Sequence, residues 1–302
     1  MSKTSLPQTW HVPQRTAGMN PREVQEVLVQ QVKPTAKDRA EKKKTRRVDG
    51  VRSTLYNPIT EKPPAFYLPE LVSQYAFVPS PEQLHFMEEL CVTKEESKLY
   101  EEETQEQADT QKWHDLRAQR LSSIEFKEVC TRGADFESLA ARQLKKTVHT
   151  VAMRHGIKTG EEAAAAYADS VECNVFPAGI VINPSRPHLV SSPDGRVYDP
   201  SEVNPWGLLE IKCPLKDSIF ELKYLKCVNV SYRLKTTHSY YYQVMGQLLL
   251  TGCQWVDFYA YCKTDFHCER LRFEAEFCSE VKMKLDQNYF EYLLPKLLQV
   301  VA

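Results

Sequence analysis

The sequence SSPDGRVYDPSEVNPWGLLEIKCP, residues 191–214, joins two apolar segments through a polar turn. Asp194 follows a Ser-Ser-Pro sequence and precedes a glycine, which is typical of a strand end or a tight turn. Sixteen residues later, Glu210 and Lys212 flank Ile211 in a segment that we predict to be a strand. Alternate side chains of a strand share a face, so Glu210 and Lys212 point the same way. A returning hairpin would bring Asp194 beside Glu210.

These side chains suit hydrolysis of a phosphodiester bond, although a structural interpretation is also open. A buried carboxylate and ammonium are costly unless paired or bound to a metal, so Glu210 and Lys212 are either a structural pair or a metal-site fragment. Asp194 adds a second carboxylate, and Mg²⁺ binds oxygen ligands together with water and substrate phosphate. The Ile211 carbonyl would supply another oxygen. Lys212 would then orient the attacking water or stabilise charge on the phosphate.

The composition is that of a globular protein with a substantial core. The chain has 302 residues, of which 42% are hydrophobic and 26% charged, enough for one large domain or two ordinary ones. The net charge of −1 means that binding of a polyanion would depend on local patches. Nine scattered cysteines, without a CxxC pair or a signal peptide, predict reduced thiols in an intracellular protein. No apolar run approaches the ~20 residues that span a bilayer, so no membrane partner is expected.

Composition divides the chain into two predicted parts. Residues 1–110 are proline-rich and irregular, with one predicted helix at 20–32. The basic run at 37–48 is either a nuclear localisation signal or a segment that binds nucleic acid, or else a solvated linker. The acidic run at 94–109 predicts an exposed helix or linker. We therefore predict an N-terminal extension that is partly basic, followed by a folded domain over 111–302, with a nuclear location as one expectation.

Residues 111–302 have the pattern of an α/β domain. Helices are predicted at 111–132 (with a break at two serines), 136–146, 159–171 (with Thr159 as its N-cap), 239–252 (ending at Gly252) and 281–300. Strands are predicted at 174–183, 189–199, 207–213, 255–262 and 268–277. This order predicts a central mixed β-sheet flanked by helices. The segment CKTDFHC at 262–268 lacks a fourth zinc ligand at the usual spacing, so its cysteines are interpreted as core or strand thiols.

Three segments carry a resemblance to a known family. The residues PD at 193–194 followed by EIK at 210–212 resemble the PD-(D/E)xK nuclease superfamily. Within it, SSPDG, LLEIKCP and YYYQVMGQLLLTG, in this order, resemble the lambda-exonuclease-type, YqaJ-like viral recombinase domain over about residues 113–300. The resemblance implies a restriction-endonuclease-like fold in which Asp194 and Glu210 bind metal and Lys212 is the catalytic lysine.

The helix after the Glu-x-Lys strand contains further candidates. Gln243 matches a glutamine that such domains place near the active site, although a surface or capping amide has the same sequence signature. Tyr240 lies on the same helix face at i,i+3 and would stack on or position Gln243, or simply pack. Gln247, one turn further on, is interpreted as structural.

A second set of candidates would grip a terminal 5′-phosphate. Arg120, Ser122 and Ser123 stand where the family has an Arg-x-x-x-Ser-like element, and an arginine with hydroxyls at a helix start makes an anion site. The alternative is an ordinary serine cap beside a solvated arginine. Ser192 matches a serine beside the catalytic aspartate and would reach the same phosphate.

The sequence departs from the family pattern at one acidic position. The family carries a glutamate on an earlier helix, and the segment HGIKTGEEAAAAYA has Gly160 in that slot. Glu161 and Glu162 follow directly, and a small rotation of the helix would let one of them substitute. We favour Glu161 as the third metal ligand. Glu137 fits the spacing formally but is interpreted as structural.

The resemblance implies an Mg²⁺-dependent deoxyribonuclease, with Mn²⁺ as a substitute for Mg²⁺. Family members typically digest one strand of linear duplex DNA from 5′ to 3′, and the remaining strand is used in recombination by strand annealing. The expected partners are therefore duplex DNA ends and an annealing or recombination protein. A homo-oligomer is compatible, since the best-known members form ring-shaped trimers. Basic residues after the Glu-x-Lys strand would line a phosphate track or form a solvated surface: Lys216, Lys223, Lys226, Arg233 and Lys235.

Two other functions remain open at this point. With Gly160 in the place of the helix acid, the chain would be a catalytically impaired nuclease-fold protein that binds DNA or a protein partner. Retention of Asp194, Glu210 and Lys212 together favours an enzyme, because a binding protein does not need all three. The third alternative is an unrelated α/β domain whose Glu-x-Lys is a strand salt bridge.

Overall fold

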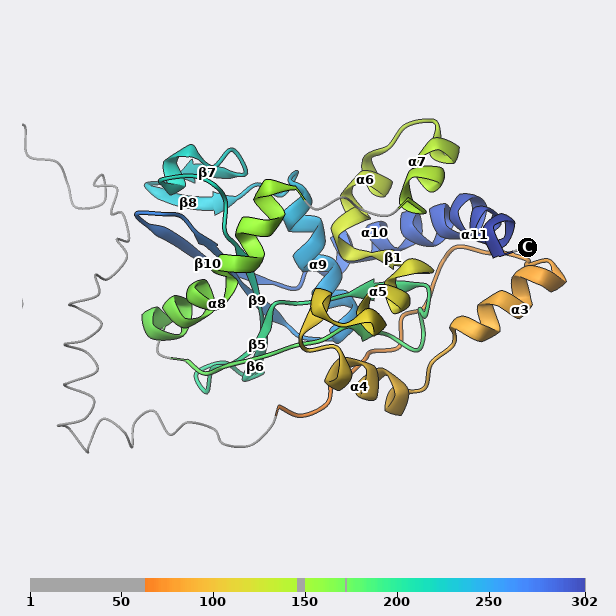
Figure 1. The fold of residues 1–302 in the computed structure, drawn as a ribbon, viewed down its shortest axis with the longest axis horizontal. Coiled ribbons are helices and arrows are strands. Elements are labelled where there is room, and N and C mark those ends of the chain that lie inside the picture. The colour runs from red at the N-terminus through yellow and green to blue at the C-terminus, as the bar shows by residue number, and fades with distance from the viewer. Residues whose placement is uncertain (1–62, 146–149, 172, 302) are drawn as a thin grey trace, which may run out of the picture.

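The computed structural model describes residues 63–145, 150–171 and 173–301 (Figure 1). The predicted helix at 20–32 and the basic run at 37–48 lie outside the described residues. Within the described part of the chain, no helix has both the length and the apolar character that a membrane span requires.

A five-stranded mixed sheet is the centre of the fold. Its strands follow the order β10-β9-β6-β5-β2, in which β6 and β9 are parallel and the other neighbours antiparallel. The strands are β2 (Val175–Phe176), β5 (Gly195–Tyr198), β6 (Trp206–Lys212), β9 (Trp255–Tyr261) and β10 (Phe266–Arg272). This arrangement confirms the predicted central mixed sheet, with the Glu-x-Lys strand in its middle.

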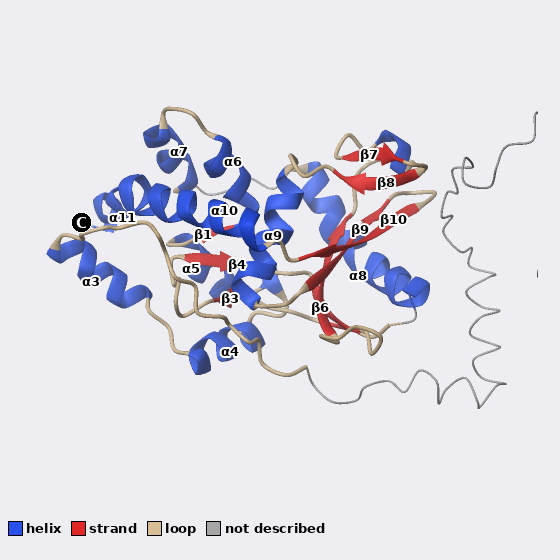
Figure 2. Ribbon diagram, turned by 180° about the vertical axis from the view of Figure 1, so that it is seen from behind, coloured by secondary structure: helices blue, strands red, loops and turns tan. Residues whose placement is uncertain are grey.

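Two helices cover opposite faces of this sheet, α8 (Val151–Val171) and α9 (Ser239–Thr251) (Figure 2). Leu208 of β6 belongs to the apolar cluster that includes the buried residues of α9. Leu209 belongs to a second cluster with Ala163 and Tyr167 of α8. Because strand side chains alternate, Glu210 lies on the α9 face together with Leu208.

Two smaller sheets and a series of helices complete the domain. One sheet has the order β1-β4-β3, with β1 (Leu121–Ser122), β3 (Val181–Ile182) and β4 (Leu189–Ser191), and the other is the hairpin of β7 (Leu225–Val228) and β8 (Ser231–Leu234). The remaining helices are α3 (Pro81–Leu90), α4 (Lys94–Glu103), η4 (Gln107–Asp109), α5 (Gln111–Ala118), η5 (Ser123–Glu125), α6 (Phe126–Thr131), α7 (Phe136–Gln143), η6 (Ile219–Glu221), α10 (Ala275–Asn288), the π-helix η7 (Tyr289–Leu293) and α11 (Leu294–Val301).

Residues before 110 pack on the same core as the residues that follow. Phe86 and Leu90 of α3 are buried in the cluster that contains α9. The Ser97 hydroxyl on α4 donates to the Ile182 carbonyl at 2.6 Å, and Glu101 accepts the Gly179 N–H at 3.1 Å. The predicted division at residue 110 therefore separates segments that share one core.

Several predicted element bounds differ from those observed. The predicted strand at 189–199 is split into β4 and β5, which belong to different sheets, because Pro193 interrupts the backbone donors at the split. Helix α8 begins at Val151, so Thr159 lies in its interior and donates to the His155 carbonyl. The prediction of Thr159 as an N-cap was therefore wrong. The prediction of Gly252 as the end of α9 is confirmed by its left-handed φ of 79°.

A close contact in β6 leads to a stability prediction. A Cβ atom added at Gly207 would lie 2.3 Å from the ring of Trp255, which is fully buried. We expect Gly207→Ala to lower the free energy of unfolding by about 1–3 kcal/mol, because the ring cannot move without displacing its neighbours. The measurement is chemical denaturation. Gly156→Ala is the control: it adds a Cβ in open space within α8 and should stabilise by about 0.5–1 kcal/mol. Equal stability of Gly207→Ala and wild type would contradict the packing of Trp255 on β6.

Candidate active site

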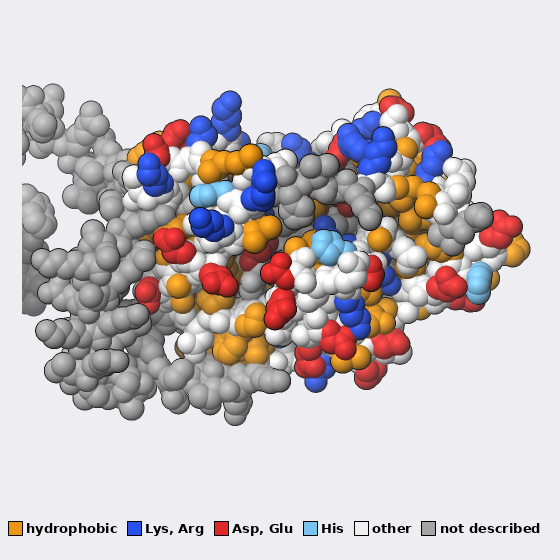
Figure 3. Space-filling model, viewed as in Figure 1, with side chains coloured by type: hydrophobic (Ala, Val, Ile, Leu, Met, Phe, Trp, Pro, Cys, Tyr) orange, Lys and Arg blue, Asp and Glu red, His pale blue; other side chains and the backbone are white. Residues whose placement is uncertain are grey.

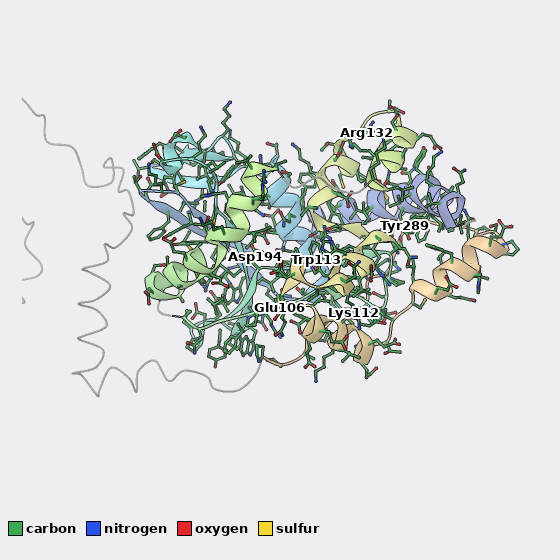
Figure 4. The ribbon with its side chains drawn as sticks, in the orientation of Figure 1. Glu106, Lys112, Trp113, Arg132, Asp194 and Tyr289 are labelled. Atoms are coloured by element: carbon green, nitrogen blue, oxygen red, sulfur yellow. The ribbon has the colours of Figure 1, made fainter. Side chains whose placement is uncertain are left out.

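The turn before β5 brings Asp194 to the end of β6, as predicted. The Asp194 N–H donates to the Leu209 carbonyl at 3.1 Å, and its Oδ2 accepts the Ile211 N–H at 2.7 Å. Gly195 pairs with Leu209, so Asp194 is the residue that continues β5 opposite Glu210. Two carboxylates from adjacent strands therefore meet at one end of the sheet. The Asp194 side chain is open to solvent, in the middle of the molecule (Figure 4).

Glu210 is buried, and three side chains donate to its carboxylate. Lys212 Nζ and Gln243 Nε2 both donate to Oε1, the latter at 2.7 Å. Gln247 Nε2 donates to Oε2 at 2.7 Å. The prediction that Gln243 lies at the site agrees with this position. Gln247, interpreted from the sequence as structural, contacts the same carboxylate, so sequence reasoning missed it. Its spacing of four residues from Gln243 was the available signal.

Lys212 is held as a cation. Burial disfavours its ammonium, but the negative charges of Glu210 and Asp194 outweigh burial and raise the pKa of Lys212 above its ordinary value. Its Nζ lies 4.6 Å from the ring centroid of Tyr240, which adds a cation–π contact. A lysine in this state donates hydrogen bonds and positive charge, and it is unsuited to accept a proton. The structure places Tyr240 against Lys212, and its predicted role beside Gln243 stays a prediction.

The described residues offer a limited set of ligands for a divalent cation. Asp194 and Glu210 are the paired carboxylates. The Leu209 carbonyl points toward Asp194. The Ile211 carbonyl, two residues further along β6, points to the same side of the strand, past the first residue of β5. These oxygens are the hard donors that Mg²⁺ prefers. Among the described residues, no three or more histidine, cysteine, aspartate or glutamate side chains converge as a metal site. The described residues therefore offer a cation two carboxylates and backbone oxygen.

The structure does not bring Glu161 into this group. Glu161 and Glu162 lie on α8, on the sheet face opposite Glu210, and both are exposed. Glu162 Oε1 accepts the hydroxyl of Tyr261 at the end of β9, at 2.7 Å. Glu137 forms an exposed ion pair with Lys296 at 3.2 Å, in agreement with a structural role. The assignment of Glu161 as a third metal ligand stays a prediction.

Ser192 connects the active site to an arginine that sequence reasoning missed. Trp113 Nε1 on α5 donates to Ser192 Oγ at 3.0 Å, and the guanidinium of Arg117 lies 4.2 Å from the Trp113 ring centroid. Figure 4 shows Trp113 near Asp194. Burial lowers the pKa of Arg117, against the attraction of Glu125. The sequence signal was the i,i+4 spacing of Trp113 and Arg117 in WHDLR.

The predicted phosphate-binding group around Arg120 has a different arrangement. Arg120 is buried, and its guanidinium donates to the carbonyls of Pro187 at 2.8 Å, Leu116 at 2.9 Å and Leu90 at 3.0 Å. These bonds join α3, α5 and the turn before β4, and they occupy all three nitrogens of the guanidinium. Three of its five N–H donors thus serve the fold, and the assignment of Arg120 as a phosphate ligand stays a prediction.

Ser122 and Ser123 are both buried beside α9. The Ser122 N–H donates to Glu125 at 3.1 Å, while the Ser122 hydroxyl has no partner among the described residues. The predicted break between helices is confirmed, with β1 and η5 lying between α5 and α6. Neither serine is exposed, so their assignment to phosphate binding stays a prediction.

The bonds of Arg120 predict a large cost for its removal. Arg120→Ala would leave three carbonyls without their donor, and we expect unfolding free energy to fall by about 2–4 kcal/mol. Arg142→Ala is the control, since Arg142 is half exposed in a surface pair with Glu128 and should change stability by no more than ~0.5 kcal/mol. Both variants are compared by chemical denaturation. A near-neutral Arg120→Ala would instead favour the candidate role of Arg120 as a phosphate ligand.

The pKa of Asp194 predicts a pH dependence of stability. Crowding by protein atoms and the charge of Glu210 raise the pKa of Asp194 to about 7, although Lys212 and the Ile211 N–H act in the opposite direction. A raised pKa means that the protonated form stabilises the fold. This contribution is complete below about pH 4 and is lost as pH rises through about 7.

Asp194→Asn removes this titration while retaining an oxygen that accepts the Ile211 N–H. In EDTA, the melting temperature of the variant should rise relative to wild type as pH increases from about 4 to about 8. Thermal melts across that range give the difference, and the Gly156→Ala variant checks that the trend is specific. A difference independent of pH would mean that Asp194 ionises at its ordinary pKa.

A mixed sheet that presents Asp194 and a Glu-x-Lys strand at one end has the arrangement of the PD-(D/E)xK class. Residues 112–254 match the family model for the YqaJ-like viral recombinase domain. Over these residues, the match confirms the resemblance that the sequence predicts. A comparison with curated proteins gave no match.

Solved structures with a similar fold include two of LHK-Exo, an alkaline exonuclease from Laribacter hongkongensis. One of them is a complex with dAMP. Each is 22% identical to this chain with a TM-score of 0.50, and the match covers 64% of this chain and 96% of LHK-Exo. This likeness shows that the two proteins share a fold, which confirms the predicted fold class.

Proposed function

We propose that this protein is a metal-dependent DNA nuclease. The observation that carries the proposal is the convergence of Asp194, Glu210 and Lys212 at one end of the sheet, with Gln243 and Gln247 fixing Glu210. The match to the YqaJ-like domain and the fold shared with an exonuclease support the same activity. The further proposal is digestion of linear duplex DNA from its 5′ ends, in recombination or in the context of a mobile element.

Asp194, Glu210 and the Ile211 carbonyl would hold Mg²⁺, or Mn²⁺ in its place. The ion, when bound, lowers the pKa of water and neutralises charge on the phosphate. The carboxylate of Glu210 is kept in one orientation by its two amide donors, so its lone pairs are fixed before any ligand arrives. Binding of a cation at the two carboxylates would also favour the ionised form of Asp194 at neutral pH.

Lys212 contributes a fixed positive charge to the same end of the sheet. Its ammonium is attached to a central strand and rests against Tyr240, so it varies little in position. From there it would donate to the attacking water or to a phosphate oxygen whose charge increases in the transition state. Ser192 and Arg117 would bind phosphates further along the substrate. The Trp113 ring connects Arg117 to Ser192 and thus to the site.

Cleavage of end-labelled linear duplex DNA tests the proposal directly. Wild type should digest the DNA in Mg²⁺ or Mn²⁺ but not in EDTA, and a 5′-phosphate on the substrate should increase the rate. Lys212→Ala and Asp194→Asn should each reduce digestion by at least about 100-fold, as expected when a charged group that acts in the transition state is removed. Lys98→Ala is the control, because Lys98 is exposed on α4 with only Glu102 nearby at 3.9 Å.

Digestion that survives both substitutions would refute the assignment of these residues. A strand-specific label then distinguishes 5′-to-3′ from 3′-to-5′ digestion, and a circular duplex distinguishes exonuclease from endonuclease activity. Sedimentation with duplex DNA would report the expected homo-oligomer.

A second function is favoured by one observation, the position of the α8 acids away from the two carboxylates. With only two carboxylates, the protein would bind DNA without cutting it. Glu161→Gln separates the two functions: if Glu161 contributes to metal binding, the variant needs more Mg²⁺ for half-maximal activity. Glu162→Gln is the matched control, because it removes the charge of the neighbouring acid and retains an oxygen that accepts the Tyr261 hydroxyl. Wild type that binds DNA without cleaving it would establish the second function.

A further inference from the structure

The hairpin of β7 and β8 places two cations directly opposite each other. Lys226 and Arg233 are register partners in this antiparallel pair, so their side chains lie on one face, and both are exposed. Like charges in this arrangement repel and destabilise a hairpin. Arg233 reaches Glu269 only at 3.5 Å and remains 55% exposed. Among the described residues, Lys226 has no acidic partner. The pair is therefore unfavourable unless an anion binds between the two cations.

The opposite face of the hairpin is attached to the domain. Leu225 and Leu234, the next register pair, are buried, and the Leu234 N–H donates to Glu269 at 2.6 Å. Alternation along the two strands puts Val228 on the outer face with Lys226, and Val228 is 41% exposed. The outer face thus consists of two cations and an apolar side chain on a rigid base. Figure 3 shows lysine and arginine side chains around a small hydrophobic area over β7 and β8.

Other basic residues near the hairpin are already paired. Lys216 lies 3.2 Å from Glu221, and Lys263 lies 3.2 Å from Asp217. Lys235 donates to the carbonyl of Lys223. Of the five basic residues that the sequence suggests as a phosphate track, Lys216 and Arg233 each have an acidic neighbour, Glu221 and Glu269. Among the described residues, Lys226 on the outer face of the hairpin is not balanced in this way.

The turn of the hairpin has an unfavourable backbone. Asn229 and Val230 have φ of 46° and 62°, the left-handed values of a two-residue type I′ turn. Asparagine tolerates this region, but a β-branched residue does so only with strain. Glycine would form the turn more easily, so the valine, which is 38% exposed, is not explained by folding. Strain of this kind points to a contact made by the side chain.

An aromatic cluster connects the base of the hairpin to the catalytic lysine. Tyr224, directly before β7, packs edge-on against Tyr240 with centroids 5.0 Å apart. The ring centroids of His238 and Tyr240 lie 4.6 Å apart, and the ammonium of Lys212 lies over the Tyr240 ring. The Lys235 N–H after β8 donates to the Tyr224 carbonyl at 2.9 Å. The hairpin is therefore fixed relative to the site.

We propose that the outer face of the β7–β8 hairpin binds the phosphate backbone of duplex DNA and holds it in line with the active site. A phosphate lies between Lys226 and Arg233 and relieves their repulsion, while Val228 and Val230 contact the sugars of the same strand. This inference rests on the proposed nuclease function for its substrate, and it assigns to that function a DNA contact outside the active site.

The test is binding of a fluorescent 20-base-pair duplex, followed by anisotropy in EDTA over a range of salt concentrations. We expect Lys226→Gln and Arg233→Gln each to reduce the slope of log affinity against log salt by about 0.9, and the double variant by about 1.8. Lys263→Gln removes an exposed lysine that is already paired with Asp217, and it should retain the wild-type slope. Wild-type slopes in both single variants would overturn the proposal.

A second substitution separates binding from stability. Lys226→Glu creates opposite charges across the hairpin, so the melting temperature should be equal to or above that of wild type, while DNA affinity falls further than in Lys226→Gln. Val230→Gly relieves the turn and should also raise the melting temperature while weakening binding. A variant that melts earlier and binds DNA normally would show that the hairpin is merely structural.

Failure of the nuclease proposal is distinguishable from failure of this one. Hydrolysis of bis(p-nitrophenyl) phosphate in Mn²⁺ reports the active site alone, and Lys226→Gln should leave it unchanged. If wild type cleaves nothing but the salt slopes change as expected, the hairpin proposal stands without the nuclease. If the hairpin variants lose binding to phosphatidylserine vesicles and not to DNA, the partner is a membrane surface and the proposal is overturned.

Discussion

The buried carboxylate of Glu210 is the group on which the rest of the site depends. A negative charge in this position is stable only because Lys212, Gln243 and Gln247 all donate to it. Two of these donors come from α9 and the third from the same strand. The bonds therefore fix the helix on the sheet in one register, and they do so through polar contacts within a largely apolar interface.

This constraint gives the two faces of the sheet different roles. The α9 face holds Glu210 and Lys212 and continues through Tyr240 to the β7–β8 hairpin. The α8 face has a mainly apolar layer around Trp255 and Tyr259, in which the buried Asp257 accepts from Tyr167 and Arg270. Because β6 runs between β5 and β9, its backbone is bonded on both sides and its charged side chains stand on a rigid base. The turn at Asp194 adds the second carboxylate where β5 begins.

Much of this arrangement is predictable from the sequence where the signals are local. The segment GLLEIKCP predicts a strand with Glu210 and Lys212 on one face, and β6 has this form. A hairpin that returns from Asp194 to the Glu-x-Lys strand is predicted to bring Asp194 beside Glu210, and the observed pairing of β5 with β6 has this register. Thr159 was misread because a cap and an interior threonine have the same local sequence, and only the start of α8 at Val151 distinguishes them.

The Glu-x-Lys strand, the set of Asp194, Glu210 and Lys212 and the family resemblance follow from the sequence, because alternation, turns and short motifs act between neighbouring residues. Tertiary structure alone decided that Gln247 reaches Glu210, that Arg120 bonds three carbonyls and that Arg117 is connected to Ser192 through Trp113. It also decided that the α8 acids lie on the other face of the sheet. These outcomes depend on which distant segments pack together, and burial then determines whether a polar side chain supports the fold or remains available to a ligand.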